Sequence, residues 1–228
     1  MGERFARVME KLKSLSDPKA VEGMARFGIN PHNTYGVSIP NIRKIAKEAG
    51  RNHLLAQQLW ESGVHEARIL ACMIDDPKMV GEGQIESWVR GFDSWDVCDQ
   101  CCSNLFDRTE FAHRKAAEWS RRKEEFVKRA GFALVAALSV HDKGATDEEF
   151  LKFLPIIKRE ADDERNFVRK AVNWALRQIG KRNKNLNKAA VETAEEIQRM
   201  DSKSAKWIAS DALRELKSSA VQKRLKST

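Results

Sequence analysis

The stretch FVRKAVNWALRQ, residues 167–178, decides the fold of this chain. Val168, Ala171 and Ala175 recur at the spacing that places side chains on one face of an α-helix. Small residues on that face allow a neighbouring helix to approach closely, while the basic residues between them can face outward. The stretch therefore predicts a helix that packs against other helices.

Similar helices recur along the chain. When Ala67, Asp99, Ala130, Ala171 and Ala209 are aligned, consecutive positions lie 32, 31, 41 and 38 residues apart. These spacings are near the range of stacked two-helix repeats of HEAT or armadillo type. We therefore predict an all-α solenoid of stacked antiparallel helix pairs, whose inner helices line a basic concave face. A globular helical bundle is the alternative.

The remaining sequence favours the same fold class. Leu, Ala, Glu, Lys and Arg dominate, and Gly and Pro together number only 17, which is few for an all-β protein of this length. Gly50 ends one predicted helix, and Thr146 with Glu149 forms a capping box at the start of another. We predict one domain over residues 1–216, followed by a basic tail at 217–228 that frays.

The positive charge is concentrated in the second half of the chain. The net charge of the 228 residues is +8. Residues 1–113 hold 14 basic and 16 acidic residues, a balance of −2, whereas residues 114–228 hold 27 basic and 17 acidic residues, a balance of +10. Such asymmetry indicates an anionic partner, with nucleic acid as the leading candidate. A lysine-rich solvated surface is the alternative.

The composition argues against a membrane protein and against a disulfide-bonded or zinc-binding protein. No window of 18 apolar residues exists, so we expect no membrane span and no membrane partner. The four cysteines are Cys72, Cys98, Cys101 and Cys102, and three of them lie within five residues. This crowding, with no signal peptide, fits buried thiols in a reducing cytoplasm. Cys98 and Cys101 have the spacing of half a zinc site, but no second pair follows, so we expect no metal.

Trp95 and Asp99 are the first candidate functional pair. They lie four residues apart on one predicted helix and therefore share a face. A large aromatic surface beside a carboxylate suits a cationic ligand. The alternative is a core tryptophan beside a solvated aspartate. Asp96 points about 100° away from them, as an early-turn acid that satisfies the helix dipole.

A second candidate surface combines an aromatic ring with bases. Lys170, Trp174 and Arg177 are spaced i, i+4 and i+7 on one helix, and Lys181 continues the stripe beside Arg169. This pattern suits contact with a nucleic-acid backbone or base. A tryptophan half-buried under aliphatic stems is the alternative. One repeat earlier, Arg129 and Lys128 occupy the corresponding basic positions.

The other tryptophans and the histidines predict no site. Trp60, Trp88, Trp119 and Trp207 lie in apolar helical registers and are interpreted as packing residues. The five histidines are scattered, without a Ser or Cys nucleophile at an interpretable spacing.

Four stretches carry a resemblance to a known family. The most specific is the stretch around Trp174 already quoted; the others are Trp95-x-x-x-Asp99, FVKRA at 126–130, and YGVSIP at 35–40 followed by RKIAK at 43–47. They occur in the family's order and span most of the chain. On these residues the chain resembles the HEAT-like-repeat DNA glycosylases for alkylated purines, the AlkD-like DNA alkylation repair family.

The resemblance implies a helical solenoid whose basic concave face holds duplex DNA. It also implies excision of N3- or N7-alkylated purines without flipping the base into a pocket, unlike most glycosylases. By position, Trp95, Asp99 and Trp174 would form the catalytic cluster, and Arg129 would contact the DNA backbone. The crowded cysteines beside Asp99 are a departure from the family's pattern.

A mechanism follows from this resemblance. Alkylation makes the purine a cation and a good leaving group, and positive charge then moves onto the sugar as the glycosidic bond breaks. Asp99 would stabilise that charge and orient water, while Trp95 and Trp174 would hold the deoxyribose. No metal, nucleotide or redox cofactor is required. No lysine is poised as a Schiff-base nucleophile, so we expect a monofunctional enzyme.

We therefore expect a cytoplasmic monomer, associated with the nucleoid, whose partner is double-stranded DNA containing alkylated purines. Its DNA contacts are expected from Lys128, Arg129, Arg169, Lys170, Arg177 and Lys181. Two rival functions remain: a non-catalytic DNA-binding solenoid, which would share every basic residue, and a protein–protein scaffold, which would bind DNA little.

Overall fold

The computed structural model describes residues 2–226, and every regular element among them is helical. This confirms the all-α prediction. The chain divides into two compact units, Met1–Thr109 and Glu110–Thr228.

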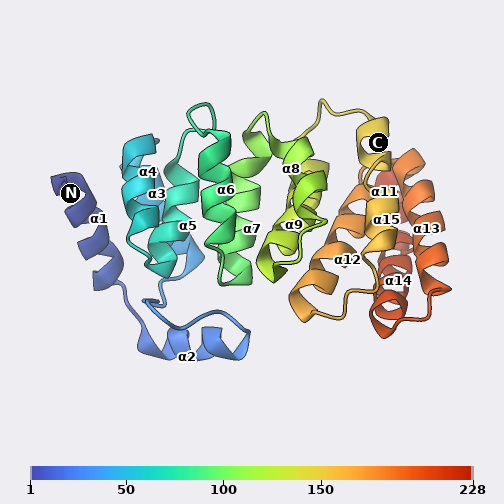
Figure 1. Cartoon of the computed structure of the whole chain (residues 1–228), viewed down its shortest axis with the longest axis horizontal. Coiled ribbons are helices and arrows are strands. Elements are labelled where there is room, and N and C mark those ends of the chain that lie inside the picture. The colour runs from blue at the N-terminus through green and yellow to red at the C-terminus, as the bar shows by residue number, and fades with distance from the viewer. Residues whose placement is uncertain (1, 227–228) are drawn as a thin grey trace. The chain divides into compact units, whose positions relative to one another are not determined.

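The first unit is a stack of short helices (Figure 1). Its elements are α1 (Glu3–Ser14), α2 (Pro18–Arg26), α3 (Ile39–Ala49), α4 (His53–Glu61), α5 (His65–Ile74), α6 (Glu82–Arg90), α7 (Trp95–Asn104) and a 3₁₀ helix, η1 (Phe106–Arg108). Helix α5 is central because it packs against α3, α4 and α7. Ala67 and Ala71 of α5 are completely buried, as small residues at a helix–helix contact should be.

The second unit also consists of packed helices. It contains α8 (Ala112–Trp119), α9 (Glu125–His141), α10 (Asp147–Leu151), α11 (Leu154–Arg159), α12 (Asn166–Gly180), α13 (Lys184–Gln198), α14 (Lys203–Leu216) and α15 (Ser219–Lys226). Of these, α9, α12, α13 and α14 have 14–17 residues. Helix α12 packs against α9, α13 and α14, and α8 packs against α9. Gly131 marks the close approach of α8 and α9, because a Cβ atom there would lie 2.5 Å from the backbone nitrogen of Ser120.

Local signals explain where several helices begin and end. The predicted capping box is present, and the backbone nitrogen of Thr146 donates to Glu149 Oε2 at 2.9 Å. Gly50 ends α3 with a φ of +65°, a conformation that glycine adopts readily.

The C-terminal segment differs from the frayed tail that its composition predicts. Residues Ser219–Lys226 form α15, in which Val221 and Leu225 are buried, and Arg224 donates to the backbone oxygen of Lys181 at 2.6 Å. Val221 and Leu225 lie one turn apart, so a single apolar stripe holds an otherwise basic helix against its unit. Residues 227 and 228 of the predicted tail lie outside the described residues.

Three of the four tryptophans interpreted as packing residues are buried. Trp60, Trp88 and Trp119 are 8%, 4% and 0% exposed, and the rings of Trp60 and Trp88 stack at 4.3 Å. Trp207 contradicts the interpretation, since 39% of it is exposed on α14. It lies beside the buried stripe of that helix rather than within it.

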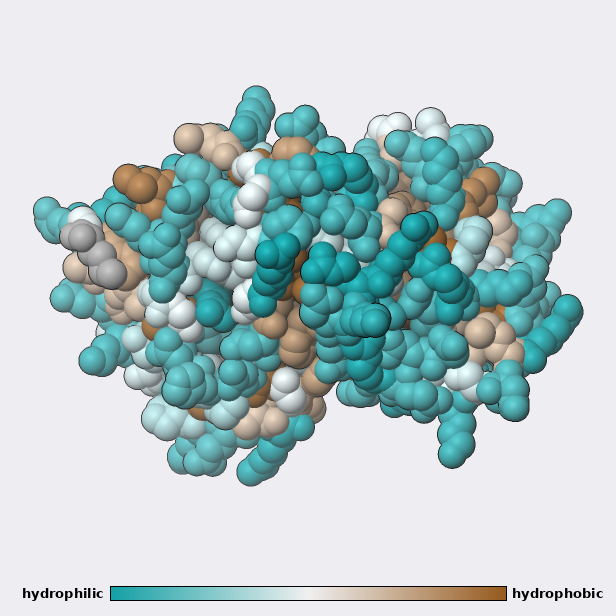
Figure 2. All heavy atoms as spheres, viewed as in Figure 1, coloured by the Kyte–Doolittle hydropathy of each residue, from teal (hydrophilic) through white to brown (hydrophobic). Residues whose placement is uncertain are grey.

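The surface is polar, with scattered apolar residues. On the face shown in Figure 2, hydrophilic side chains predominate in both units. Among residues 2–226 no helix is long and apolar enough to cross a membrane.

Candidate functional site

Trp95 and Asp99 lie one turn apart on α7, and both side chains are half-buried. This placement confirms that they share a helix, and it puts neither of them in the packed interior. The indole Nε1 of Trp95 donates to the backbone oxygen of Phe27 at 3.1 Å, which fixes the ring against the chain that follows α2. The start of α7 is fixed as well, because the buried Ser94 hydroxyl accepts a 2.9 Å hydrogen bond from Asn30 N.

A largely apolar pocket of about 340 Å³ adjoins Trp95. Its apolar wall comes from α2, from the segment that leads into α3, and from Ile69 of α5. Its polar side chains, besides the indole of Trp95, are Ser38, His65, Asp96 and Gln100. Trp95 thus has an accessible cavity within its own unit, beside a small cluster of titratable groups.

His65 and Asp96 form a buried pair at this pocket. His65 Nε2 lies 2.8 Å from Asp96 Oδ2, and the His65 side chain is almost completely buried. Burial lowers the pKa of His65, but the hydrogen bond and charge of Asp96, with the charge of Glu66, outweigh it and raise the pKa above the ordinary 6.5. Asp96 is therefore more than the first-turn acid that its position predicts. Its Oδ1 is buried without a partner among residues 2–226.

This pair makes stability depend on pH. A histidine whose pKa is raised in the folded state stabilises the protein fully below its unfolded pKa, and that stabilisation is lost as pH rises through the folded pKa. We expect the wild-type Tm to fall as pH rises above about 6.5. The fall should be smaller in Asp96→Asn, where the partner charge is gone. Thermal unfolding followed by circular dichroism across this range measures the difference; equal slopes would contradict it.

Glu66 holds the loop that forms one wall of the pocket. Its carboxylate is completely buried and accepts hydrogen bonds from the backbone nitrogens of Tyr35, Gly36 and Val37, the shortest at 2.6 Å from Gly36. Gly36 has a φ of +81°, and a Cβ atom there would lie 2.3 Å from the backbone oxygen of Asp17. The loop therefore needs both the carboxylate and the glycine.

The cysteines near Asp99 are buried thiols, as predicted. Burial, together with a hydrogen bond in which the Cys101 thiol donates to Cys72, holds the pKa of Cys101 well above its usual value. Burial and a hydrogen bond donated by the Cys102 thiol to Cys98 likewise raise the pKa of Cys102. Protonated thiols are poor nucleophiles and poor metal ligands. Across residues 2–226, no group of three or more His, Cys, Asp or Glu residues has an arrangement that could hold a metal ion.

In the second unit, α12 carries the predicted aromatic and basic stripe. Trp174 is half-buried, and its indole makes no hydrogen bond or ring contact with other described residues. Lys170, one turn earlier, is exposed and has no ion-pair partner within residues 2–226. Both side chains are therefore available to a ligand.

The rest of the stripe is joined to α14 by a ladder of contacts. The guanidinium of Arg169 lies 5.1 Å from the ring centre of Trp207, and Asn173 donates to Asp211 at 2.7 Å. Arg177 pairs with both Asp211 and Glu215, and Lys181 pairs with Glu215 at 2.7 Å. The charges of Arg177 and Lys181 are thus already balanced within the unit. Burial alone would raise the pKa of Glu215, but its hydrogen bonds and ion pairs with Lys181 and Arg177 outweigh burial and hold that pKa below its usual range.

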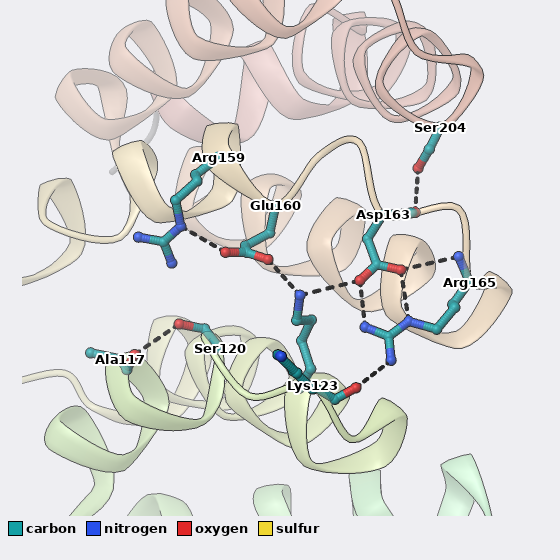
Figure 3. A network of polar contacts seen from close by, with 9 residues as sticks. Ala117, Ser120, Lys123, Arg159, Glu160, Asp163, Arg165 and Ser204 are labelled. Atoms are coloured by element: carbon teal, nitrogen blue, oxygen red, sulfur yellow. Dashed lines mark hydrogen bonds and ion pairs between the residues drawn. The ribbon is translucent and has the colours of Figure 1, made fainter.

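The two predicted bases on α9 are also engaged. Lys128 pairs with Glu160 at 2.6 Å and Asp163 at 3.3 Å, within the polar network around these two acids in Figure 3. Arg129 is only 6% exposed, and its Nη1 donates to the backbone oxygen of Phe167 at 2.6 Å. Arg129 therefore joins α9 to the start of α12, and its predicted DNA contact stays a prediction.

Sequence reasoning missed His65, Glu66 and Trp207. The spacing of the repeats contained a usable signal, because His65 and Asp96 lie 31 residues apart, and Glu66 lies 29–31 residues from the nitrogens it binds. Trp207 lies 38 residues after Arg169, at the same offset that joins Asn173 to Asp211. Contacts between equivalent turns of successive repeats recur at such offsets.

Comparison with known proteins identifies a family and a related fold. The family described as "DNA alkylation repair enzyme" matches residues 8–216. The "Uncharacterized protein Lin0241" of Listeria innocua serovar 6a is 23% identical over 197 residues, covering 85% of this chain and 86% of that protein. A solved structure described as "A new family of proteins related to the HEAT-like repeat DNA glycosylases with affinity for branched DNA structures" is 21% identical. It has a TM-score of 0.78 and covers 97% of this chain and 95% of its own, so the two share a fold.

Proposed function

The chain belongs to the family of DNA alkylation repair enzymes, and on that premise we propose that it hydrolyses the N-glycosidic bond of cationic N3- or N7-alkylated purines in duplex DNA. The products are the free base and an abasic site. The observation that carries the proposal is the position of Asp99, one turn from Trp95 on a partly exposed face of α7.

In the proposed reaction the alkylated purine leaves as a neutral base, because it was a cation before the bond broke. Positive charge develops on the deoxyribose, and the Asp99 carboxylate stabilises it and orients the attacking water. Water supplies the hydroxyl group that joins the sugar, and its remaining proton passes to solvent. The indole of Trp95, on the same helix as Asp99, holds the deoxyribose, and the indole of Trp174 in the second unit is assigned to the DNA backbone.

Binding of the duplex is assigned to the basic second unit. Lys170 supports this role most directly, because it is exposed and unpaired among the described residues. Phosphates would have to replace the acidic partners of Lys128, Arg177 and Lys181. Arg169 and Arg129 would contact phosphates while keeping their present contacts with Trp207 and with the backbone of Phe167. The protein works as a monomer in this proposal.

The second candidate function is DNA binding without catalysis. The description of the structural relative as having affinity for branched DNA favours it. The two candidates differ in whether a base is released, since both need the same basic surface.

Incubation with methylated duplex DNA, followed by chromatography of the soluble fraction, tests the proposal. We expect 7-methylguanine or 3-methyladenine to be released and the DNA to acquire abasic sites that alkali cleaves. Binding without release at any salt concentration would favour the second candidate. Little DNA affinity, with no steep dependence on salt, would instead favour a protein–protein scaffold.

A further inference from the structure

Trp207 is an exposed tryptophan held in a fixed orientation. It projects from α14 with 39% of its surface exposed, whereas the three packing tryptophans are at most 8% exposed. The Arg169 guanidinium lies 5.1 Å from its ring centre, and that guanidinium is itself held by a 3.3 Å hydrogen bond to Asn166. The ring is therefore supported from its own unit while much of it still faces solvent.

The charges around Trp207 differ from those further along the same two helices. At the far end of the ladder, Asp211 and Glu215 balance Arg177 and Lys181. At the Trp207 end, Lys170 on α12 and Lys203 on α14 are exposed and have no ion-pair partners within residues 2–226.

Arg169 likewise forms no ion pair within that range. We call the set Arg169, Lys170, Lys203 and Trp207 the Trp207 patch. It offers an aromatic surface together with an uncompensated positive charge.

We propose that the Trp207 patch binds single-stranded DNA by stacking an unpaired nucleobase on Trp207, while Lys170 and Lys203 contact the flanking phosphates. Every nucleobase has a flat π-surface, so stacking on an aromatic side chain needs no particular sequence. Bases inside a duplex already stack on their neighbours and cannot offer that surface without being unpaired. The patch therefore distinguishes unpaired from paired DNA, and the inference rests on the DNA binding proposed above.

The charge of the patch argues for this occupant. Three cations without acidic partners favour a polyanion, and an exposed ring against one of them suits a strand that carries both phosphates and accessible bases. An acidic protein partner would satisfy the cations but would give Trp207 no repeating flat partner. Protein binding is accordingly one of the outcomes of the test that would overturn the proposal.

The test compares a fluorescein-labelled oligothymidylate of about 12 nucleotides with a blunt unmodified duplex, by anisotropy at one salt concentration. We expect Trp207→Ala to weaken oligothymidylate binding by roughly fivefold to a hundredfold, the range for loss of one base–aromatic stack. Duplex binding should change less than about twofold. Trp207→Phe, which keeps a ring, should retain most of the affinity, and Leu54→Ala, which removes another exposed apolar side chain, is the matched control.

Tryptophan fluorescence supplies a second readout. Stacking on a base quenches an indole, so wild-type protein should lose more emission on binding oligothymidylate than Trp207→Phe does. Unchanged oligothymidylate affinity in Trp207→Ala, an equal loss on both DNAs, or no binding of oligothymidylate by the wild type would each overturn the inference. Duplex binding and base release are measured separately and test the proposed function. A failure of the Trp207 patch to bind single-stranded DNA can therefore be distinguished from a failure of the proposed function.

Discussion

Replacing Asp99 by asparagine is expected to lower the rate of base release by a factor of about 10² to 10³ while leaving duplex affinity nearly unchanged. The substitution keeps the size and shape of the side chain and removes its negative charge. A fixed charge that meets positive charge only in the transition state contributes to the rate and little to binding of the ground state.

The measurement is single-turnover release of 7-methylguanine from methylated duplex, with Kd determined in parallel on the same DNA. Asp76→Asn is the matched control, because Asp76 lies in the same unit, after α5, and pairs with the exposed Arg51 at 3.7 Å. Its Oδ1 also accepts a hydrogen bond from Lys78 N, which an asparagine oxygen can keep. We expect the control to release base at the wild-type rate. A wild-type rate in Asp99→Asn would remove Asp99 from the mechanism, and a parallel loss of affinity would assign it to binding.

The largest expected effect on stability comes from Glu66→Ala. The change leaves the backbone nitrogens of Tyr35, Gly36 and Val37 without their acceptor. Each buried donor left unsatisfied costs about 1–3 kcal/mol, so we expect the free energy of unfolding to fall by about 3–5 kcal/mol after partial solvation of the loop. That is a large part of the stability of an ordinary domain.

Urea denaturation followed by circular dichroism measures this loss. Glu61→Ala, at the exposed end of α4, is the control and should stay within about 0.5 kcal/mol of wild type. Glu66→Gln separates charge from shape, because it keeps one acceptor oxygen but places an amide donor against backbone donors; its loss should be intermediate. A loss below about 1 kcal/mol in Glu66→Ala would mean that water replaces the carboxylate without difficulty.

The helices and their repetition were predictable because they depend on short-range spacing. Small residues such as Ala67, Ala130 and Ala171 recur where helices must approach, and all three are completely buried. The shared face of Trp95 and Asp99 follows from the same rule, since four residues make about one helical turn.

What sequence reasoning could not supply is the partner of each polar side chain. Lys128 and Arg177 look alike as free bases, yet their acidic partners lie 32–38 residues away. The buried pair of His65 and Asp96 was hidden for the same reason. The DNA-binding roles proposed for Lys128 and Arg177 therefore rest on the family to which the chain belongs, not on the spacing of residues within one helix.

Two other errors have a common physical cause. Trp207 adjoins Ile208 in sequence, but the buried stripe of α14 runs through Ile208, and Trp207 is rotated about 100° from it. The polar composition of the tail predicted fraying, although Val221 and Leu225 lie on one face of α15 and are buried there. In both cases the identity of a residue was weighed more heavily than its angle around the helix axis.

The contacts between α12 and α14 have a consequence for engineering. Arg169 meets Trp207, Asn173 meets Asp211 and Arg177 meets Glu215, each across 38 residues. Sliding α14 by one residue along α12 would break all three contacts at once. The three contacts therefore fix the register of α14 against α12, and none of them involves a residue of the intervening α13. The α13–α14 hairpin should therefore be exchangeable between related scaffolds, provided that the incoming α14 keeps Trp207, Asp211 and Glu215 opposite the matching residues of the recipient α12.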